Sequence, residues 1–242
     1  MLDKIDRKLS HFYNAKPHML AGDTPIVSFT FDDVPLTSID PGAQILKNHG
    51  ATGTFYLSGG LAGQDNLDRP QYATSDIDRL LSDGHEIGCH TFGHVAAADV
   101  NGAGLANEFD RNLAFLAPRI GDQDLVSFSY PFGSTTLAAK RLVRQRFETG
   151  RGISPGLNSG KVDLSHLKAN AIYSGQMTEE MITDLIQSAI AEKAWLIFYT
   201  HDISNDPTPY GCSPDLFEFA VQEAANADCQ ILSMREAMAR VT

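Results

Sequence analysis

The feature that most constrains the fold of this chain is a regular alternation of predicted strands and helices. Short segments bounded by turn residues predict strands at residues 25–31, 52–57, 86–89, 126–130, 149–153, 167–172, 195–199 and 230–232. Segments with helical periodicity or helix-capping residues lie between them, at 40–49, 74–82, 103–117, 137–147, 178–192 and 214–225. Strands that alternate with helices predict βαβ units and a parallel sheet. About seven such units indicate an α/β fold of the (β/α) barrel type, closed or nearly closed.

The length of the chain suits one domain of this kind. It has 242 residues, of which 43% are hydrophobic and 20% are charged, which is ordinary for a chain that buries a sizeable core. We expect residues 25–242 to form the barrel domain. Residues 1–24 are expected to form an N-terminal extension that packs on it.

Charge and cysteine content limit the partners and the compartment. The formal net charge is −11, so neither nucleic acid nor anionic lipid is an expected partner, whereas a neutral glycan needs no charge steering. The three cysteines form no CxxC motif, and the first 20 residues lack the apolar run of a signal peptide. The apolar run at 194–199 is far shorter than the roughly 20 residues that cross a bilayer. We therefore expect a cytoplasmic protein without an integral membrane segment; the alternative is a secreted mature chain that lacks its signal. The sequence leaves the oligomeric state open.

Two adjacent carboxylates, Asp32 and Asp33, follow the apolar strand PIVSFTF. Adjacent carboxylates repel one another and are costly to place beside a core. Either they cap the turn that contains Pro35, or one binds a cation while the other acts as a base beside it.

Two histidines, His90 and His94, follow the next predicted strand but one. Side chains at i and i+4 point the same way if the segment makes a helical turn, and neutral imidazoles suit a borderline cation such as zinc. A lone HxxxH is also compatible with ordinary histidines at the edge of the core. Its position after a strand, like that of the Asp pair, favours a metal site.

A third titratable group, His201, follows the strand WLIFY. Histidine suits proton transfer near neutral pH, although an ordinary loop histidine is the alternative. One aspartate and two histidines leave metal positions open for water and substrate, which is typical of a catalytic site. With a second carboxylate as base and a histidine as acid, the set indicates hydrolysis of an amide or ester.

In combination, these residues resemble the polysaccharide deacetylases, carbohydrate esterase family 4, also called the NodB homology domain. The resemblance extends from about residue 25 to residue 232. It rests on Thr30-Phe31-Asp32-Asp33, on His90-Thr91 followed by His94, on Tyr130-Pro131-Phe132-Gly133 and on a strand that ends before His201.

The resemblance implies a distorted (β/α) barrel of about seven parallel strands with one divalent metal, usually Zn²⁺, although another transition metal such as Co²⁺ is an alternative. It implies metal binding by Asp33, His90 and His94. It further implies Asp32 as general base and His201 as general acid. Tyr130, Pro131, Phe132 and Tyr199 are expected to bind substrate, and the N–H of Phe132 is expected to stabilise the oxyanion.

Two positions depart from the family pattern. Tyr199 stands where the family usually has a leucine that lines the acetyl pocket. Ser129 stands where the family usually has an arginine that orients the catalytic aspartate. We expect Arg151 to supply the missing guanidinium from a neighbouring strand end, with Asp163 holding Arg151; the alternative is that Arg151 is a surface residue.

Three functions remain compatible with the sequence. The first is metal-dependent removal of N-acetyl, or O-acetyl, groups from a polysaccharide, an oligosaccharide or an activated sugar precursor. The second is deformylation or hydrolysis of a small non-sugar amide. The third is a metal-binding glycan-recognition module without turnover, which the serine at position 129 favours and the presence of both Asp32 and His201 disfavours.

Overall fold

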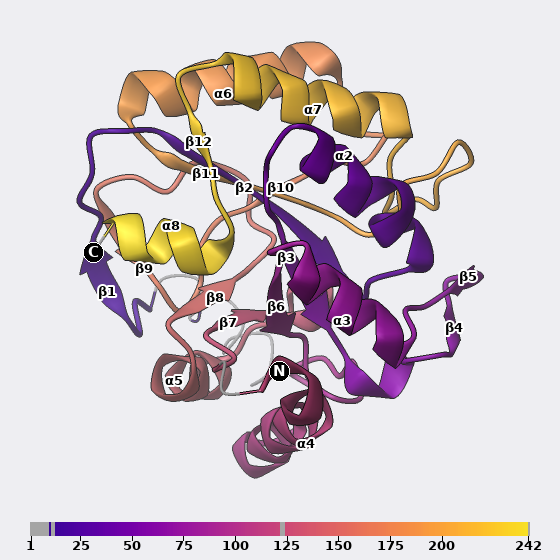
Figure 1. Cartoon of the computed structure of the whole chain (residues 1–242). Coiled ribbons are helices and arrows are strands. Elements are labelled where there is room, and N and C mark those ends of the chain that lie inside the picture. The colour runs from indigo at the N-terminus through magenta and orange to yellow at the C-terminus, as the bar shows by residue number, and fades with distance from the viewer. Residues whose placement is uncertain (1–9, 11–12, 122–123, 242) are drawn as a thin grey trace.

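The molecule is built around one curved sheet of parallel strands (Figure 1). The computed structural model describes residue 10, residues 13–121 and residues 124–241. The strands of this sheet are β2 (Ile26–Asp32), β3 (Thr54–Leu57), β6 (Glu86–Cys89), β7 (Ser127–Ser129), β8 (Thr149–Arg151), β10 (Asn170–Ala171), β11 (Trp195–Thr200) and β12 (Gln230–Ile231). Seven of them follow the order β10, β11, β2, β3, β6, β7, β8, and β12 pairs with the first residues of β2. The predicted α/β fold with parallel strands is confirmed.

One segment brings the two ends of this sheet together. Leu167 forms a parallel bridge with Arg151 of β8, and β10, which begins three residues later, pairs with β11. The sheet therefore curls toward closure, in agreement with the distorted barrel that the sequence predicts.

Helices pack against the sheet, most of them on its outer face. They are α2 (Gln44–Asn48), α3 (Thr74–Ser82), α4 (Gly102–Ile120), α5 (Leu137–Arg146), α6 (Glu179–Glu192), α7 (Pro214–Asn226) and α8 (Met234–Val241). In Figure 1, α6 and α7 lie side by side at the top and α4 and α5 lie at the bottom. The side chains of Asn101, Thr136, Thr178 and Ser213 each accept a backbone N–H in the first turn of a helix, which explains where α4 to α7 begin. Among the described residues, no helix combines the length and the apolar character needed to span a bilayer.

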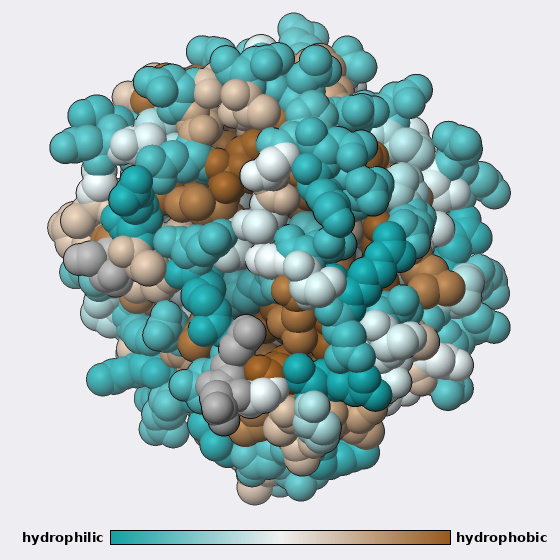
Figure 2. Space-filling view, viewed as in Figure 1, coloured by the Kyte–Doolittle hydropathy of each residue, from teal (hydrophilic) through white to brown (hydrophobic). Residues whose placement is uncertain are grey.

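Because helices and loops cover both faces of the sheet, its central strands are buried along their whole length. All residues of β2 and β11 are buried. The main core lies between sheet and helices and includes the stacked rings of Phe31 and Phe55, whose centroids are 4.4 Å apart. A second core joins Trp195 to residues of α8, which begins where the backbone N–H of Met234 donates to Thr54 at the start of β3. Figure 2 shows a mainly hydrophilic face, with hydrophobic residues in the recesses.

The described part of the N-terminal extension packs on the barrel. Its strand β1 (Pro17–Met19) pairs antiparallel with β9 (Lys161–Asp163), a pair that the sequence pattern does not predict. Residues 1–9 and 11–12 of the extension lie outside the described residues, and the division at residue 25 stays a prediction.

A short hairpin, also not predicted, projects beside the strand ends. It consists of β4 (Asp65–Asn66) and β5 (Arg69–Pro70), joined by two residues. Figure 1 shows it at the right edge of the molecule, away from the sheet.

Candidate metal and catalytic site

Polar residues gather where the parallel strands end. Asp32 is the last residue of β2, Ser129 the last of β7 and Arg151 the last of β8. His90 follows β6 directly, and His201 follows β11. The carboxyl ends of parallel strands meet at one edge of the sheet, which is where barrels of this type carry their chemistry.

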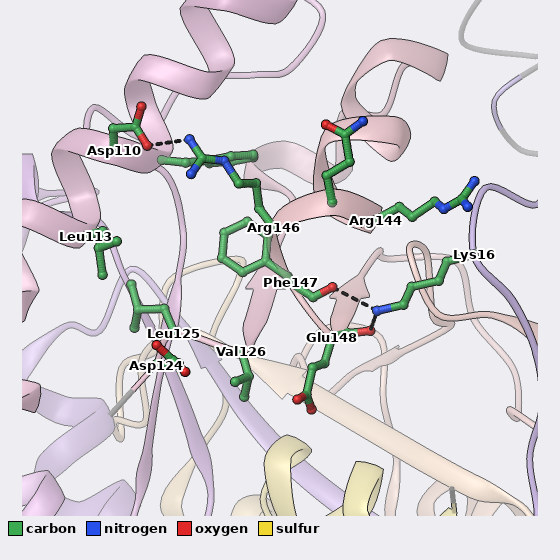
Figure 3. Close-up of a pocket in the computed structure, with 12 residues that line it drawn as sticks. Lys16, Asp110, Leu113, Asp124, Leu125, Val126, Arg144, Arg146, Phe147 and Glu148 are labelled. Carbon is green, nitrogen blue, oxygen red and sulfur yellow. Dashed lines mark hydrogen bonds and ion pairs between the residues drawn. The ribbon is translucent and has the colours of Figure 1, made fainter. Parts of the chain in front are cut away.

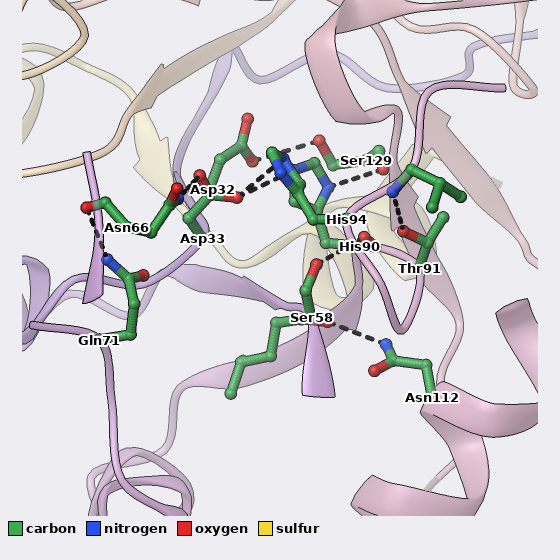
Figure 4. Close-up of polar contacts among 12 residues, drawn as sticks. Asp32, Asp33, Ser58, Asn66, Gln71, His90, Thr91, His94, Asn112 and Ser129 are labelled. Atoms are coloured by element: carbon green, nitrogen blue, oxygen red, sulfur yellow. Dashed lines mark hydrogen bonds and ion pairs between the residues drawn. The ribbon is translucent and has the colours of Figure 1, made fainter. Parts of the chain in front are cut away.

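A carboxylate and two imidazoles meet at this edge and fit a metal ion (Figure 4). Oδ1 of Asp33 lies 3.0 Å from Nε2 of His94 and 3.5 Å from Nε2 of His90, and one ligand atom from each residue lies within 4.8 Å of the others. Asp33 and His90 are buried, and Oδ1 of Asp33 has no hydrogen-bond partner among the described residues. An unpartnered buried carboxylate oxygen that faces two imidazoles fits a borderline divalent cation.

The surroundings prepare these groups as ligands. Nδ1 of His90 lies 2.8 Å from the carbonyl oxygen of Ser129, an arrangement that leaves Nε2 toward Asp33. Burial lowers the pKa of His90 to about 3 and lowers the pKa of His94, so both imidazoles are neutral at pH 7. Burial also raises the pKa of Asp33 to about 6. Asn66 of the β4–β5 hairpin donates a hydrogen bond of 2.8 Å to Oδ2 of Asp33, which leaves Oδ1 free to bind a cation.

Backbone strain is concentrated around the same residues. Eight non-glycine residues of the described chain have a positive φ angle, and all except Lys193 lie in the site or in the hairpin beside it. Asp33 (63°), Thr91 (61°), His94 (49°) and Phe132 (58°) are among them. Such conformations cost on the order of 1 kcal/mol each or more, and they persist where the surroundings fix them for a function.

Asp32 is buried against Arg151. The guanidinium of Arg151 forms an ion pair with Oδ1 of Asp32, and the hydroxyl of Ser129 donates to the same oxygen at 3.2 Å. Burial alone would raise the pKa of Asp32, but the charges of Arg151, His90 and His201, together with the hydrogen bond from Arg151, outweigh it and lower this pKa to about 2. Asp32 is therefore ionised at pH 7.

The location of Arg151 explains the serine at position 129. Ser129 and Arg151 are direct partners in the register of β7 and β8, so a guanidinium at position 151 enters the site from the neighbouring strand. Its Cζ atom lies 4.7 Å from the ring centre of Tyr199 and 5.3 Å from that of Tyr56, and its Nη1 donates to the carbonyl oxygen of Gly152 at 3.1 Å. The structure thus brings Arg151 to Asp32, as the sequence predicts.

Asp163 lies elsewhere, and the expectation that it holds Arg151 is wrong. It forms an ion pair of 2.7 Å with Lys140 and accepts hydrogen bonds from the backbone N–H groups of Ala15, Lys16 and Ser165. Its strand β9 leaves the parallel sheet to pair with β1, which directs Asp163 to the N-terminal extension.

His201 follows β11, the strand that pairs with β2, so it lies at the same edge of the sheet as Asp32, among aromatic rings. Its ring centre is 5.7 Å from that of Tyr210 and 6.1 Å from that of Tyr173. The loop that follows is held by Asp202, a buried carboxylate that accepts the N–H of Thr208 at 2.9 Å. Nδ1 of His201 is buried and has no hydrogen-bond partner among the described residues.

These groups share one cavity of about 390 Å³. Tyr130, Phe132 and Tyr199 line it, whereas Pro131 is buried and is not among the described lining residues, so its contact with substrate stays a prediction. The ring of Phe132 is 68% exposed and lies 4.5 Å from the ring of His94.

Asn66 and Tyr173 also line the cavity and were missed from the sequence. Asn66 lies in a two-residue strand with no periodic pattern. Tyr173 follows β10, and its place two residues beyond a strand end was the available indication.

Comparisons with known proteins agree with this geometry. The family model described as polysaccharide deacetylase matches residues 21–146. A chitin deacetylase of Arthroderma benhamiae is 33% identical over 94 residues, which are 39% of this chain and 24% of that protein, so the match spans about a quarter of the relative's length.

Two solved structures share the fold. The Xyl-CE4 domain of a multidomain xylanase from the hindgut metagenome of Trinervitermes trinervoides has a TM-score of 0.62 at 14% identity, covering 90% of this chain and 91% of that one. A family 4 acetyl xylan esterase from Clostridium thermocellum, in complex with a cobalt ion, has a TM-score of 0.61 at 18% identity, covering 88% and 90%. Because the family model matches more than half of the chain and the fold agrees with it, the chain belongs to the polysaccharide deacetylase family.

Proposed function

We propose that this chain is a metal-dependent hydrolase that removes acetyl groups from the nitrogen of an N-acetylated carbohydrate. The observation that carries the proposal is the meeting of Asp33, His90 and His94 around one point, in a cavity that a second, ionised carboxylate and a third histidine also line. A binding site alone would need neither of the last two groups.

The three ligands would hold a divalent transition metal, and we propose Zn²⁺, with Co²⁺ as a functional replacement. Two neutral imidazoles and one carboxylate favour such cations over Mg²⁺ or Ca²⁺, which prefer all-oxygen sites. When bound, such a cation polarises the acyl carbonyl and acidifies water.

Asp32 would accept a proton from the attacking water. Its ionisation at pH 7 keeps it ready for this role, and Arg151 and Ser129 fix the orientation of its Oδ1. Arg151 is thus a positioning residue that acts through Asp32. Its presence removes the argument for a site without turnover, because the guanidinium that position 129 lacks arrives from position 151.

His201 would donate a proton to the departing sugar nitrogen. It lines the same cavity as Asp32 and follows the strand that pairs with β2, so both groups can reach one acyl carbon. In the proposal the backbone N–H of Phe132 stabilises the oxyanion, and Tyr130 and Tyr199 contact the substrate.

The experiment is acetate release from N-acetylated chito-oligosaccharides by the purified protein. We expect chelation to abolish release, Zn²⁺ or Co²⁺ to restore it, and Asp32→Asn to lower it by about 100-fold or more, the range typical of a lost acid–base group. Asp110→Asn, on the exposed face of α4, is the matched control and should keep full activity. Release that survives chelation or Asp32→Asn would refute the proposal.

The same assay separates the alternatives. O-acetylated xylan, formylated amino sugars and small formamides are offered in parallel at equal concentration. Preference for a non-sugar formamide would move the chain to the second function, whereas metal binding without any turnover would move it to the third.

We also propose that the protein acts in a reducing compartment, the cytoplasm. Cys89, Cys212 and Cys229 are free thiols in the structure. Burial raises the pKa of each of these thiols, which keeps them in the unreactive protonated form.

A further inference from the structure

Exposed apolar side chains gather around the catalytic pocket. Among the described residues nine large apolar side chains are exposed, and four of them line this pocket: Leu67, Phe132, Ile153 and Tyr210. An apolar rim around a pocket marks a surface that a ligand covers.

The pocket continues into an apolar groove. A second cavity of about 630 Å³ lies beside it, and Ile153 and Tyr199 line both. The groove extends along the start of α6, where Met177, Met181 and Leu185 line it; its polar side chains are Asn170, Gln176 and Asp184. Met181 is a fifth member of the nine exposed side chains, so five of the nine lie in this pocket or groove.

Apart from the metal ion proposed at Asp33, His90 and His94, neither cavity offers a cation to an anionic ligand. None of the described residues that line them is a lysine or an arginine, and their carboxylates are Asp32, Asp33 and Asp184. A nucleotide diphosphate in the groove would meet negative charge without compensation. Among the sugar precursors compatible with the sequence, the nucleotide-linked kind is therefore disfavoured.

One of these exposed apolar residues, Leu67, has an unfavourable backbone conformation. Leu67 (φ 52°) and Asp68 (φ 56°) are the two residues between β4 and β5, a turn that favours Asn-Gly. A leucine in this conformation costs on the order of 1 kcal/mol, and because its side chain is 47% exposed, burial does not repay the cost in the free protein. A ligand that covers Leu67 would offset it.

We propose, building on the deacetylase function above, that the substrate is an N-acetyl sugar that carries an aliphatic chain, and that the chain lies in the groove between Ile153 and Met181. Aromatic faces at Phe132 and Tyr210 suit a sugar ring, but leucine, isoleucine and methionine offer no ring face and no hydrogen bond to a further sugar unit. Such side chains gain by burying methylene groups, at about 0.8 kcal/mol for each.

The test compares four substrates that all contain N-acetylglucosamine: methyl and octyl N-acetylglucosaminide, an N-acetylated chitin tetrasaccharide and UDP-N-acetylglucosamine. The octyl glycoside is used below its micelle-forming concentration. We expect kcat/KM for the octyl glycoside to exceed that for the methyl glycoside by at least about tenfold, the equivalent of burying roughly two methylene groups. The tetrasaccharide and the nucleotide sugar should both be poorer substrates than the octyl glycoside. The proposal would be overturned if the kcat/KM values of the octyl and methyl glycosides differed by less than about twofold, or if the tetrasaccharide or the nucleotide sugar were the better substrate.

Met181→Glu places a charge in the groove without harming the helix. Met181 is the third residue of α6, its N–H is bonded to the hydroxyl of Thr178, and a glutamate there completes the capping pattern of a helix start. We expect the octyl-to-methyl ratio to fall toward one. Met19→Glu, which changes a methionine that is 63% exposed on β1, is the matched control and should leave the ratio as it is. If Met181→Glu and Met19→Glu had the same octyl-to-methyl ratio of kcat/KM, the preference for the octyl chain would arise from a surface other than this groove.

Calorimetric binding of the two glycosides separates this proposal from the function on which it rests. If the octyl glycoside bound more tightly but no substrate released acetate, the binding of the chain in the groove would be supported and the deacetylase function refuted. Acetate release at equal efficiency from both glycosides, with equal affinity, would retain the deacetylase and refute the groove. Neither release nor chain-dependent binding would refute both.

Discussion

Two hollows of nearly equal volume lie at opposite ends of the barrel strands. The catalytic pocket, of about 390 Å³, lies at the carboxyl ends. The other hollow, of about 410 Å³, is lined by residues of α4, by the end of α5 and by Val126 and Glu148, which directly precede β7 and β8 (Figure 3). Size alone therefore does not distinguish them.

Their charges differ in burial and in partners. In the hollow at the amino ends, Arg146 pairs with Asp110, both side chains being about half exposed, and Nζ of Lys16 donates to the carbonyl oxygens of Phe147 and Glu148 at 3.0 and 2.9 Å. In the catalytic pocket the carboxylates are buried, and Oδ1 of Asp33 has no hydrogen-bond partner among the described residues. A buried polar atom without a hydrogen-bond partner therefore indicates a functional site better than the volume of the cavity does.

The largest effect should come from Asp33, whose Oδ1 has no hydrogen-bond partner among the described residues. Asp33→Ala removes one of the three proposed metal ligands, and we expect activity to fall by about a thousandfold or more, because a bound metal would supply several kcal/mol of transition-state stabilisation. Elemental analysis of the desalted protein should show loss of the bound metal. Asp110→Ala in the other hollow is the control and should keep both metal and activity. Equal metal content in the two variants would contradict the ligand assignment.

The next largest effect concerns the guanidinium beside Asp32. Arg151→Met leaves a buried carboxylate unpaired, which costs about 3–5 kcal/mol of stability and lowers activity by roughly 100-fold through the misplaced base. The pKa of Asp32, now about 2, should rise, so the acidic limb of the kcat/KM profile should move to higher pH.

A second variant tests whether the charge or the fold is at fault. Since Ser129 and Arg151 face each other across β7 and β8, the double substitution Ser129→Arg with Arg151→Met moves the guanidinium one strand along. We expect it to recover at least about tenfold of the activity that Arg151→Met loses, and to return the acidic limb toward lower pH. No recovery by a folded double variant would show that Arg151 does more than orient Asp32.

A smaller effect is expected for His85, a buried histidine that lines neither hollow. Burial lowers the pKa of His85 to about 4, and Nδ1 of its ring accepts the N–H of Gly53 at 3.0 Å, away from both hollows. In the unfolded chain the pKa is about 6.5, so as pH falls from 6.5 toward 4 the unfolded state gains a proton that the folded state refuses. The free energy of unfolding should then drop by about 2 kcal/mol more in the native protein than in His85→Gln between pH 7 and 5, measured by urea denaturation. Parallel pH curves for the two proteins would contradict this.

The sequence predicts the catalytic pocket well because the pocket is built from strand ends. Apolar runs locate β2 and β11, and the positions of the first titratable residues after these runs, Asp32 and His201, follow once the sheet is known to be parallel. Arg151 could be predicted for the same reason, since it ends the strand beside Ser129.

Residues outside this repeating pattern could not be placed in the same way. Asp163 belongs to a strand that leaves the parallel sheet, and its partner Lys140 is set by the tertiary course of the N-terminal extension. Asn66 reaches Asp33 from a hairpin of two-residue strands, too short to show any periodicity. The hollow at the amino ends likewise joins residues that no local pattern connects.

The smallest effect should come from that hollow. Arg146→Ala breaks an exposed ion pair with Asp110, and such pairs contribute at most about 1 kcal/mol, often nothing measurable. We expect the midpoint of urea denaturation to shift little and kcat/KM to stay within about twofold of the native value, because neither charge is desolvated and each returns to water when its partner is removed. A tenfold loss of activity in the folded variant would show that this hollow influences the opposite end of the barrel. The two cavities would then differ in the burial and pairing of their charges, but both would matter for activity.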